Sequence, residues 1–242
     1  MSATPLDILA IAAHRDDVEQ TCGGTLLKAA QLGQRTGILD LTQGEMGTRG
    51  TAEDRAREAE DAARILGVGW RRALDIPDGR VENTWENRLK VASVIRETRP
   101  RVVILPYWKG RHPDHYTCSV LGYEACFLAG LGKLALGSQP LAPHRPFKII
   151  YATLYYDVRP TFVVDITQQF EQKFASILAY KSQFSDQEAG KDLFPAHDEI
   201  HARVESMARN SGALGGVTYA EPFLQKEVGL VEDLLALPVK SI

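Results

Sequence analysis

The sequence has 242 residues, of which 44% are hydrophobic and 24% charged, with a formal net charge of −3. This length suits one large or two small domains, and folding can bury roughly 70–75% of the extended chain's surface without any stabilising disulfide. The charge balance gives no reason to expect nucleic acid or an anionic membrane as a partner. No apolar run reaches about 18 residues, so we expect no membrane span.

Cysteine usage and the N-terminus indicate the compartment. The three cysteines, Cys22, Cys118 and Cys126, form no CxxC pair, and so small and odd a set is typical of a reducing environment. The first five residues lack the basic region of a signal peptide. We therefore predict a cytoplasmic protein in which Cys118 and Cys126 are buried apolar residues.

Strand and helix patterns alternate along the first half of the chain. Residues 7–13 form a short apolar run without Gly or Pro, which predicts a buried strand. Further strands are predicted over 36–42, 70–76 and 101–106, and helices over 20–32, 51–66 and 84–98. Thr51 followed by Asp54 is typical of a capping box, and Gly67 ends that helix. This alternation favours an α/β fold with a mostly parallel sheet.

The second half continues with fewer strands. A helix is predicted over 116–128, followed by a loop rich in Gly and Pro over 130–146. Two strands follow over 147–156 and 161–166, and two helices over 167–181 and 197–211, with a mobile loop at 185–195. The chain has neither an internal repeat nor a low-complexity linker, which favours a single domain over residues 1–242.

A histidine and two aspartates directly follow the first predicted strand. His14, Asp16 and Asp17 thus stand where a strand gives way to a helix, and ligands collect at the carboxyl ends of strands in α/β sheets. Adjacent carboxylates repel one another unless a cation or a shared proton relieves them. Helix capping by either aspartate is the ordinary alternative. We predict a divalent metal bound by His14 and one aspartate, with the other aspartate free to act as a base.

A second cluster, residues 111–115 (Arg-His-Pro-Asp-His), follows the fourth predicted strand. The carboxyl ends of the first and fourth strands can meet at one edge of a parallel sheet. Catalytic zinc commonly takes three protein ligands and leaves a fourth position for water, and His14, Asp17 and His115 would supply such a set.

The remaining polar residues of both clusters then fit amide hydrolysis. Asp16 can accept a proton from a water molecule that the metal has made more acidic. His112, if protonated, can stabilise an oxyanion or protonate the leaving amine, and Asp114 can orient His112. A Pro-led helix start explains part of the second cluster without any function.

A glycine-rich loop over residues 43–50 lacks the spacing of a phosphate-binding loop, and Glu45 within it would repel phosphate. We expect this loop to contact a sugar or another substrate. Arg49, Arg55 and Arg111 lie near the two clusters in sequence and are candidate substrate-binding residues, although surface arginines are usually only solvated.

These residues resemble a known family. Residues 13–19 (Ala-His-Arg-Asp-Asp-Val-Glu) and 112–115 (His-Pro-Asp-His) resemble the two signatures of the LmbE-like, or PIG-L, zinc N-deacetylases. The branch called bacillithiol biosynthesis deacetylase 1 is similar in further segments: 42–50 with Arg55 and 58–59, 160–166, 180–184 and 219–223. The resemblance covers nearly the whole chain.

The resemblance implies a Rossmann-like three-layer α/β sandwich, with zinc, or alternatively iron(II), held by His14, Asp17 and His115. It implies Asp16 as the general base and His112, backed by Asp114, as the electrostatic stabiliser and acid. Positions matching Glu45, Arg55 and Arg111 surround the substrate in relatives. The branch deacetylates N-acetyl-α-D-glucosaminyl L-malate for bacillithiol synthesis, and its members are often hexamers, so a homo-oligomer is expected.

Two residues depart from the family pattern. Arg15 stands where Pro or Ala is usual, and a long cation there offers a contact for an anionic substrate group. Tyr116 stands where a small or basic residue is common. Neither removes a ligand, but both leave the substrate open.

Three alternatives stay open at this point. The substrate could be another N-acetyl sugar, such as a glucosaminyl inositol or a chitooligosaccharide. Two histidines and one carboxylate also form the facial triad of non-haem iron oxygenases, although the free Asp16 argues against that class because oxygen activation needs no base. A non-catalytic sugar-binding protein would require neither Asp16 nor His112.

Overall fold

The computed structural model describes residues 5–136, 141–153, 157–184 and 197–239. A central sheet of seven strands has the order β3-β2-β1-β4-β5-β7-β6. The strands comprise β1 (Ile8–Ala12), β2 (Thr36–Asp40), β3 (Trp70–Ala73), β4 (Val102–Pro106), β5 (Lys148–Ala152), β6 (Phe162–Asp165) and β7 (Ala220–Leu224). The first five strands are parallel, and β7 runs antiparallel to both β5 and β6.

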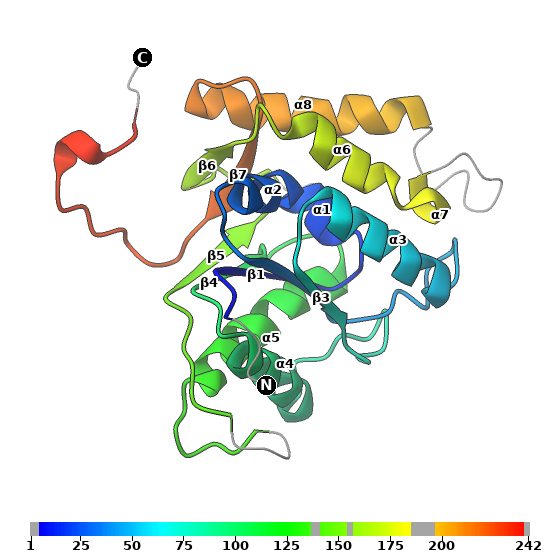
Figure 1. The fold of residues 1–242 in the computed structure, drawn as a ribbon, viewed down its shortest axis with the longest axis vertical. Helices are drawn as coiled ribbons and strands as arrows, with labels where there is room; N and C mark the ends of the chain where they lie inside the picture. The colour runs from blue at the N-terminus through cyan, green and yellow to red at the C-terminus, as the bar shows by residue number, and fades with distance from the viewer. Residues whose placement is uncertain (1–4, 137–140, 154–156, 185–196, 240–242) are drawn as a thin grey trace.

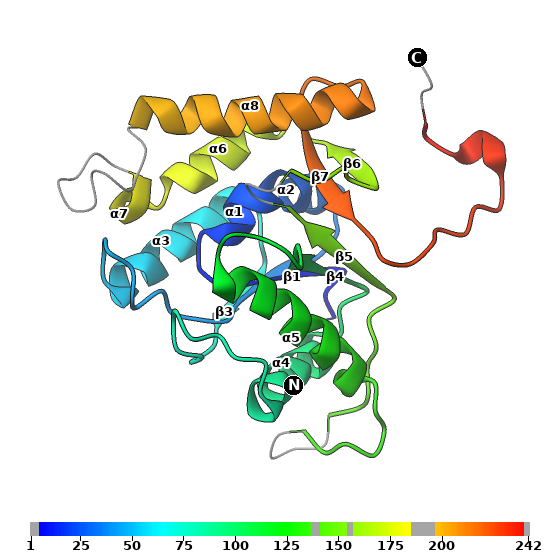
Figure 2. The same cartoon turned by 180° about the vertical axis from the view of Figure 1, so that it is seen from behind.

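Helices cover both faces of this sheet and give a three-layer sandwich (Figure 1). One face carries α4 (Trp85–Thr98) and α5 (Pro113–Ala129). The other carries α1 (Asp17–Thr21), α2 (Gly23–Gln31), α3 (Ala52–Ile65), α6 (Phe170–Leu178), α7 (Lys181–Phe184) and α8 (His197–Gly215). A 3₁₀ helix, η1 (Leu234–Ala236), lies in a C-terminal segment that leaves the body, as the view from behind also shows (Figure 2).

The predicted α/β class and mostly parallel sheet are confirmed. Apolar side chains of the sheet pack against α4 and α5 on one face and against α1 and α2 on the other, as Leu9 and Ala10 of β1 illustrate. The capping box of α3 is also present, because the hydroxyl of Thr51 accepts from the backbone of Asp54 while the Asp54 carboxylate accepts from the backbone of Thr51.

Two predicted helices and one unpredicted strand mark where the structure differs from expectation. The helix expected over 20–32 is two helices, α1 and α2, which meet at Cys22. The helix expected over 167–181 is the shorter α6, followed by α7. Strand β7 was not predicted, and the predicted mobile loop at 185–195 lies outside the described residues.

The burial of the cysteines and the expected absence of a membrane span can also be compared with the structure. Cys22, Cys118 and Cys126 are free and buried, as expected for the last two. Among the residues that the structure describes, no helix is both long and apolar enough to cross a membrane.

The strand order explains how distant residues meet. Strands β1 and β4 are direct neighbours and run in the same direction. The residues after β1, which begin with Ala13 and His14, and the residues after β4, which lead to His112, therefore lie at the same edge of the sheet. The segment after β3, which includes Asp78, reaches this edge as well, two strands away from β1.

Candidate active site

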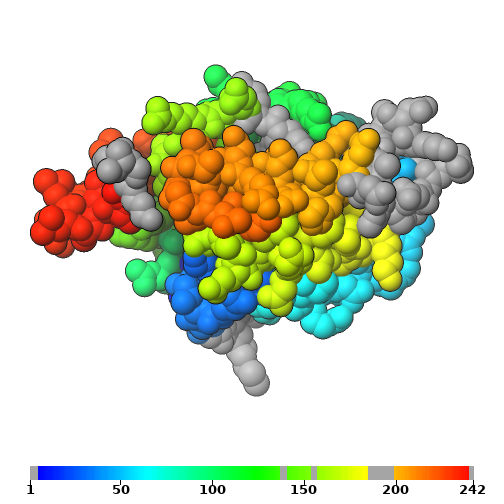
Figure 3. Space-filling model, turned by 90° about the horizontal axis from the view of Figure 1, so that it is seen from above, coloured from blue at the N-terminus to red at the C-terminus, as the bar shows by residue number. Residues whose placement is uncertain are grey.

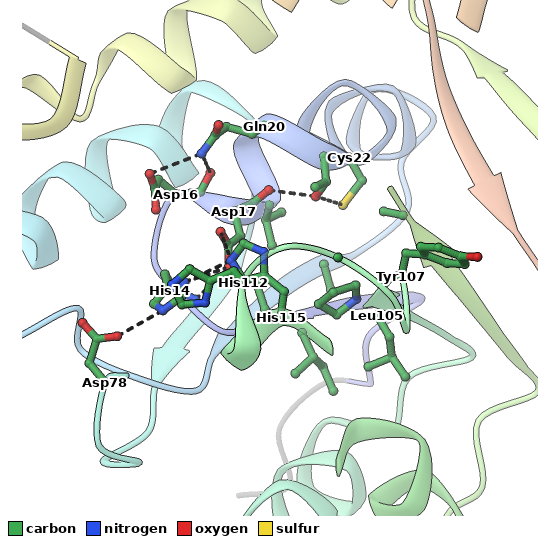
Figure 4. A pocket seen from close by; sticks show the side chains of 18 of the residues that line it. His14, Asp16, Asp17, Gln20, Cys22, Asp78, Leu105, Tyr107, His112 and His115 are labelled. Atoms are coloured by element: carbon green, nitrogen blue, oxygen red, sulfur yellow. Dashed lines mark hydrogen bonds and ion pairs between the residues drawn. The ribbon is translucent and has the colours of Figure 1, made fainter. Parts of the chain in front are cut away.

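The three predicted metal ligands lie together. Nδ1 of His14 is 3.4 Å from Oδ2 of Asp17 and 3.2 Å from Nε2 of His115, and Oδ1 of Asp17 is 3.1 Å from the same His115 nitrogen (Figure 4). His14 comes from the loop after β1, Asp17 from the first position of α1, and His115 from the first turn of α5. Two segments about a hundred residues apart in the chain thus bring three side chains together at one point.

This arrangement fits a tetrahedral metal. Nitrogen and oxygen ligands at about 2.0–2.2 Å from a tetrahedral zinc ion lie roughly 3.3–3.5 Å apart. The observed separations are 3.1–3.4 Å, with one oxygen of Asp17 facing each histidine. Two other groups of donors lie within 4.8 Å of one another, one adding His112 to the two histidines and one joining His14 to Asp78 and Asp114. Both are less suited, because His112 already accepts a backbone N–H and the two aspartates already accept several.

The far edge of the His14 ring is held by two carboxylates. Its Nε2 lies 3.0 Å from Oδ1 of Asp78 and 3.4 Å from Oδ2 of Asp114. Backbone groups fix both carboxylates in turn, since Asp78 accepts from Met46 and Asp114 accepts from Gly79 and Val81. A proton on Nε2 leaves the Nδ1 lone pair directed at the metal position, which is the usual arrangement around a metal-bound histidine.

The charges around this point favour a cation. Burial alone would lower the pKa of His14, but Asp17, Asp114 and Asp78 outweigh it and raise that pKa to about 12 in the metal-free protein. Burial likewise opposes the charged form of Asp17, yet His115 and His14 hold its pKa well below the usual range. For His115, attraction by Asp17 exceeds the effect of burial and raises the pKa. In the metal-free protein, protons on the two histidine rings therefore supply the positive charge that a bound divalent metal would supply.

The predicted base, Asp16, points into the same cavity but does not join the donor cluster. Its Oδ1 accepts from Nη2 of Arg55 at 2.7 Å, and its Oδ2 lies 3.3 Å from the amide nitrogen of Gln20. The backbone N–H of His14 donates instead to Asp17. Neighbouring carboxylates therefore face different partners, as the two proposed roles require.

His112 caps the N-terminus of α5, since its Nδ1 accepts the backbone N–H of Asp114 at 3.2 Å. Its ring stacks on that of His115, with centroids 4.7 Å apart. Burial and the charges of His14 and His115 lower the pKa of His112. The carboxylate of Asp114 lies 3.4 Å from Nε2 of His14, so the structure pairs it with the His14 ring and not, as predicted, with the ring of His112.

A cavity of about 750 Å³ opens over these groups. Asp16, Asp17 and the three histidines line its floor, and Met46, Lys109 and Arg111 stand among its other walls. Such a volume suits a sugar with a substituent.

The predicted substrate-binding residues occupy different places. Arg55 and Arg111 line the cavity, whereas Arg49 is buried and donates to the carbonyl of Gln183. Glu45 shapes the glycine-rich loop, because its carboxylate accepts the backbone N–H groups of Gln43 and Asp78.

The unusual Arg15 does not face the cavity. Its side chain is buried and donates to the carbonyl of Ala52, at the start of α3. The expectation that this cation would contact an anionic substrate group is therefore wrong for the described conformation.

Sequence reasoning missed Asp78. The segment Pro77-Asp78-Gly79 is typical of a turn, and it forms one. Its position after a third parallel strand was the available signal, because that strand ends at the same sheet edge as β1 and β4.

Comparisons with known proteins give a consistent result. A family model described as GlcNAc-PI de-N-acetylase, PIG-L, matches residues 9–126, which include every donor described above. The chain is 35% identical over 225 residues to the diacetylchitobiose deacetylase of Thermococcus kodakarensis, covering 88% of this chain and 80% of that protein.

Solved structures agree in fold. The conserved protein TT1542 of Thermus thermophilus matches with a TM-score of 0.83 and 41% identity, over 94% of this chain and 98% of the other. The N,N'-diacetylchitobiose deacetylase of Pyrococcus horikoshii, solved with its inhibitor MPG, matches with a TM-score of 0.76 and 27% identity, over 89% and 82%.

Proposed function

Because the chain belongs to the PIG-L family of GlcNAc-PI de-N-acetylases, it is an amide-hydrolysing enzyme of the N-acetylglucosamine deacetylase type, and we propose that it acts on N-acetyl-α-D-glucosaminyl L-malate with zinc as its metal. Deacetylases of this family depend on a metal. The observation that carries the proposal is the cluster of His14, Asp17 and His115 at the cavity, in which Nδ1 of His14, Nε2 of His115 and the two carboxylate oxygens of Asp17 make contacts of 3.1–3.4 Å.

The donor set favours zinc, with iron(II) as the alternative. Imidazole and carboxylate ligands suit either ion, and three ligands at tetrahedral spacing are typical of catalytic zinc. A divalent metal held there would supply Lewis-acid chemistry, since it polarises a carbonyl and makes water more acidic.

Asp16 and His112 then have separate roles in handling protons during the reaction. Asp16 accepts the proton of the attacking water, and Arg55 together with Gln20 fixes the direction in which its carboxylate points. His112 keeps its proton on Nε2, because Nδ1 accepts from the backbone, so Nε2 donates to the oxygen that becomes negative. The single ring proton of neutral His112 is then engaged with that oxygen, so we assign the acid role to Asp16 instead of His112. Asp16 returns its proton to the leaving nitrogen as the C–N bond breaks, which gives the free amine of the glucosaminide and acetate.

Two features support malate as the aglycone. Several segments outside the two signatures resemble the bacillithiol branch, and Lys109 and Arg111 line the cavity with positive charge. A guanidinium fork matches a carboxylate, so Arg111 suits a malate dianion. Arg55 is less suited to this contact because it is buried against Asp16.

Acetate release from three substrates tests the proposal: N-acetylglucosaminyl malate, N-acetylglucosaminyl inositol and diacetylchitobiose. We expect malate to give the highest kcat/KM, and Arg111→Ala to raise KM for malate more than for chitobiose. Arg101→Ala is the matched control, since this exposed arginine stands at the opposite end of β4. Equal or higher kcat/KM on a neutral aglycone would refute the malate assignment, and no release from any of the three would refute the activity.

We also propose that the chain forms a homo-oligomer, for which the family resemblance suggests a hexamer. A C-terminal arm, residues 226–239, is exposed at every position and projects from the body (Figure 3). Val228, Leu230 and Leu235 of this arm are 90–97% exposed. Chain segments that stay in contact with solvent are usually polar. The exposed apolar side chains of this arm therefore favour its packing against a partner chain.

The body offers a matching surface. Helix α5 exposes a row of apolar side chains at helical spacing, namely Tyr116, Val120, Tyr123 and Phe127. The arm carries Glu232 and Asp233, and Arg145 lies over the ring of Phe127 at the end of that row. Apolar contact and opposite charge therefore suit docking of one copy's arm on another copy's α5.

A further inference from the structure

The backbone carbonyl of Arg15 is held from inside the protein by two buried side chains. Nη2 of Arg71 donates to it at 2.7 Å, and the hydroxyl of Tyr180 makes a short hydrogen bond to the same oxygen. This carbonyl belongs to the peptide that joins Arg15 to Asp16. It therefore lies between a proposed metal ligand, His14, and the proposed base.

Arg71 is itself fixed in direction. On β3 it donates through Nε and Nη2 to the carboxylate of Asp40, at 2.9 and 3.1 Å, and through Nη1 to Glu19 at 2.6 Å. A further Nη1 contact reaches the carbonyl of Ala59 in α3. The rigid guanidinium thus ties strands β2 and β3 and helices α1 and α3 to one carbonyl of the active-site loop.

Tyr180 is the second side chain that holds the Arg15 carbonyl, and it comes from a helical layer of the fold. It follows α6, its side chain is fully buried, and its hydroxyl also lies 3.1 Å from Oε1 of Glu19. The two donors come from segments far apart in the chain, β3 and the residues after α6. Neither residue lines the cavity.

From this geometry we propose that Arg71 and Tyr180 are positioning residues, which fix the Arg15–Asp16 peptide and so aim the Asp16 carboxylate. The proposal rests on the proposed function, in which Asp16 is the base. Rotation of that peptide would swing Asp16 away from the donor trio, whereas Asp17 would remain tied to the His14 backbone and to both rings. Misplacement of a catalytic group by about 1 Å can cost on the order of 100-fold in rate.

Tyr180→Phe is the principal test, because it deletes one hydroxyl without unpairing a charge. Arg71→Lys is the second variant and keeps the positive charge between Glu19 and Asp40. We expect each to lower kcat about 10- to 100-fold with KM within about twofold, while bound metal stays stoichiometric. Hydrogen exchange of the peptide covering residues 13–18 should quicken in both variants.

Two matched controls separate positioning from general destabilisation. Tyr151→Phe removes another buried hydroxyl, one with no hydrogen-bond partner among the described residues. Arg96→Lys alters another buried arginine that donates to backbone carbonyls, those of Ala129, Leu131, Leu134 and Leu141, away from the site. In both controls, kcat and the hydrogen-exchange rate of residues 13–18 should stay at the wild-type level, even if Tm changes.

The outcomes are distinct. If Tyr180→Phe and Arg71→Lys leave kcat and exchange at the wild-type level, or change them no more than the controls do, the positioning role is wrong. If wild-type protein releases no acetate at all, the proposed function fails. Exchange of residues 13–18 then still decides whether Arg71 and Tyr180 fix the loop, because that readout needs neither metal nor substrate.

Discussion

The carboxylate of Asp78 holds Nε2 of His14 at 3.0 Å, on the edge of the ring opposite to the one that faces Asp17 and His115. The contact selects the tautomer whose Nδ1 lone pair points at the metal position. Asp78 is therefore part of the proposed metal site through its contact with His14, one of the three proposed ligands.

Replacing Asp78 should weaken metal binding. We expect Asp78→Ala to lower metal affinity about 10- to 100-fold, as is typical when the partner of a ligating histidine is removed. Competition with a chromophoric chelator measures this. Asp75→Ala is the control, because Asp75 is exposed and pairs with Lys90 outside the site. Equal affinity in wild type and Asp78→Ala would contradict the assignment.

Asp16→Asn should separate catalysis from metal binding. The amide cannot accept the proton of water, so acetate release should fall by roughly 10²–10⁴-fold with metal content unchanged. His115→Ala should instead lose the metal, because it removes one of three donors. Turnover and metal analysis of both variants test the division of roles. Unchanged turnover in metal-loaded Asp16→Asn would refute its role as base.

Metal affinity should rise with pH. Binding requires neutral imidazoles, and in the metal-free protein the pKa of His14 is raised to about 12 and that of His115 is raised as well. Protons therefore compete below those values, and raising the pH removes them. We expect apparent affinity to increase from pH 6 to pH 9 by up to about tenfold per unit for each displaced proton.

Calorimetry in buffers of different ionisation enthalpy counts the protons released. The variant His115→Gln should release fewer protons and show a shallower slope than wild type. An affinity independent of pH would show that the carboxylates do not hold these rings in the charged form.

Deleting the C-terminal arm should dissociate the assembly. Light scattering should give wild-type protein a multiple of the 26.7 kDa chain mass, and protein lacking residues 226–242 should be monomeric. Leu234→Asp with Leu235→Asp should have the same effect, since both side chains are more than 80% exposed apolar groups. Leu32→Asp is the control, an exposed leucine on the body. Monomeric wild type would refute the proposal.

Periodicity and strand-end reasoning were enough to predict the parallel part of the sheet and the convergence of His14, Asp17 and His115. Both depend on local patterns plus one rule, that parallel strands end at one edge. The break between α1 and α2 depends on tertiary contact instead. The backbone N–H groups of Gly24 and Thr25 donate to Glu221, a residue that no local pattern connects to them.

Strand β7 escaped prediction for a similar reason. It is five residues long and contains Pro222, which normally argues against an interior strand. Its pairing with β5 involves Phe223 and Leu224, so the proline lies beyond that ladder and faces only β6. The contacts of Arg71 and Tyr180 with the Arg15 carbonyl likewise follow from three-dimensional packing, because these residues are 56 and 165 positions away from Arg15 in the chain.

The place of β7 between β5 and β6 constrains how the protein is made. Within the described part of the chain, strand β6 joins the sheet through β7 alone. The backbone N–H of Gly24 donates to the carboxylate of Glu221, 197 residues further along the chain, so this contact forms late in synthesis. On the ribosome, therefore, the catalytic edge of the sheet can be synthesised long before the far edge closes. A nascent chain that lacks β7 exposes the unpaired edge of β5, and such an edge is prone to pair with other chains until β7 covers it.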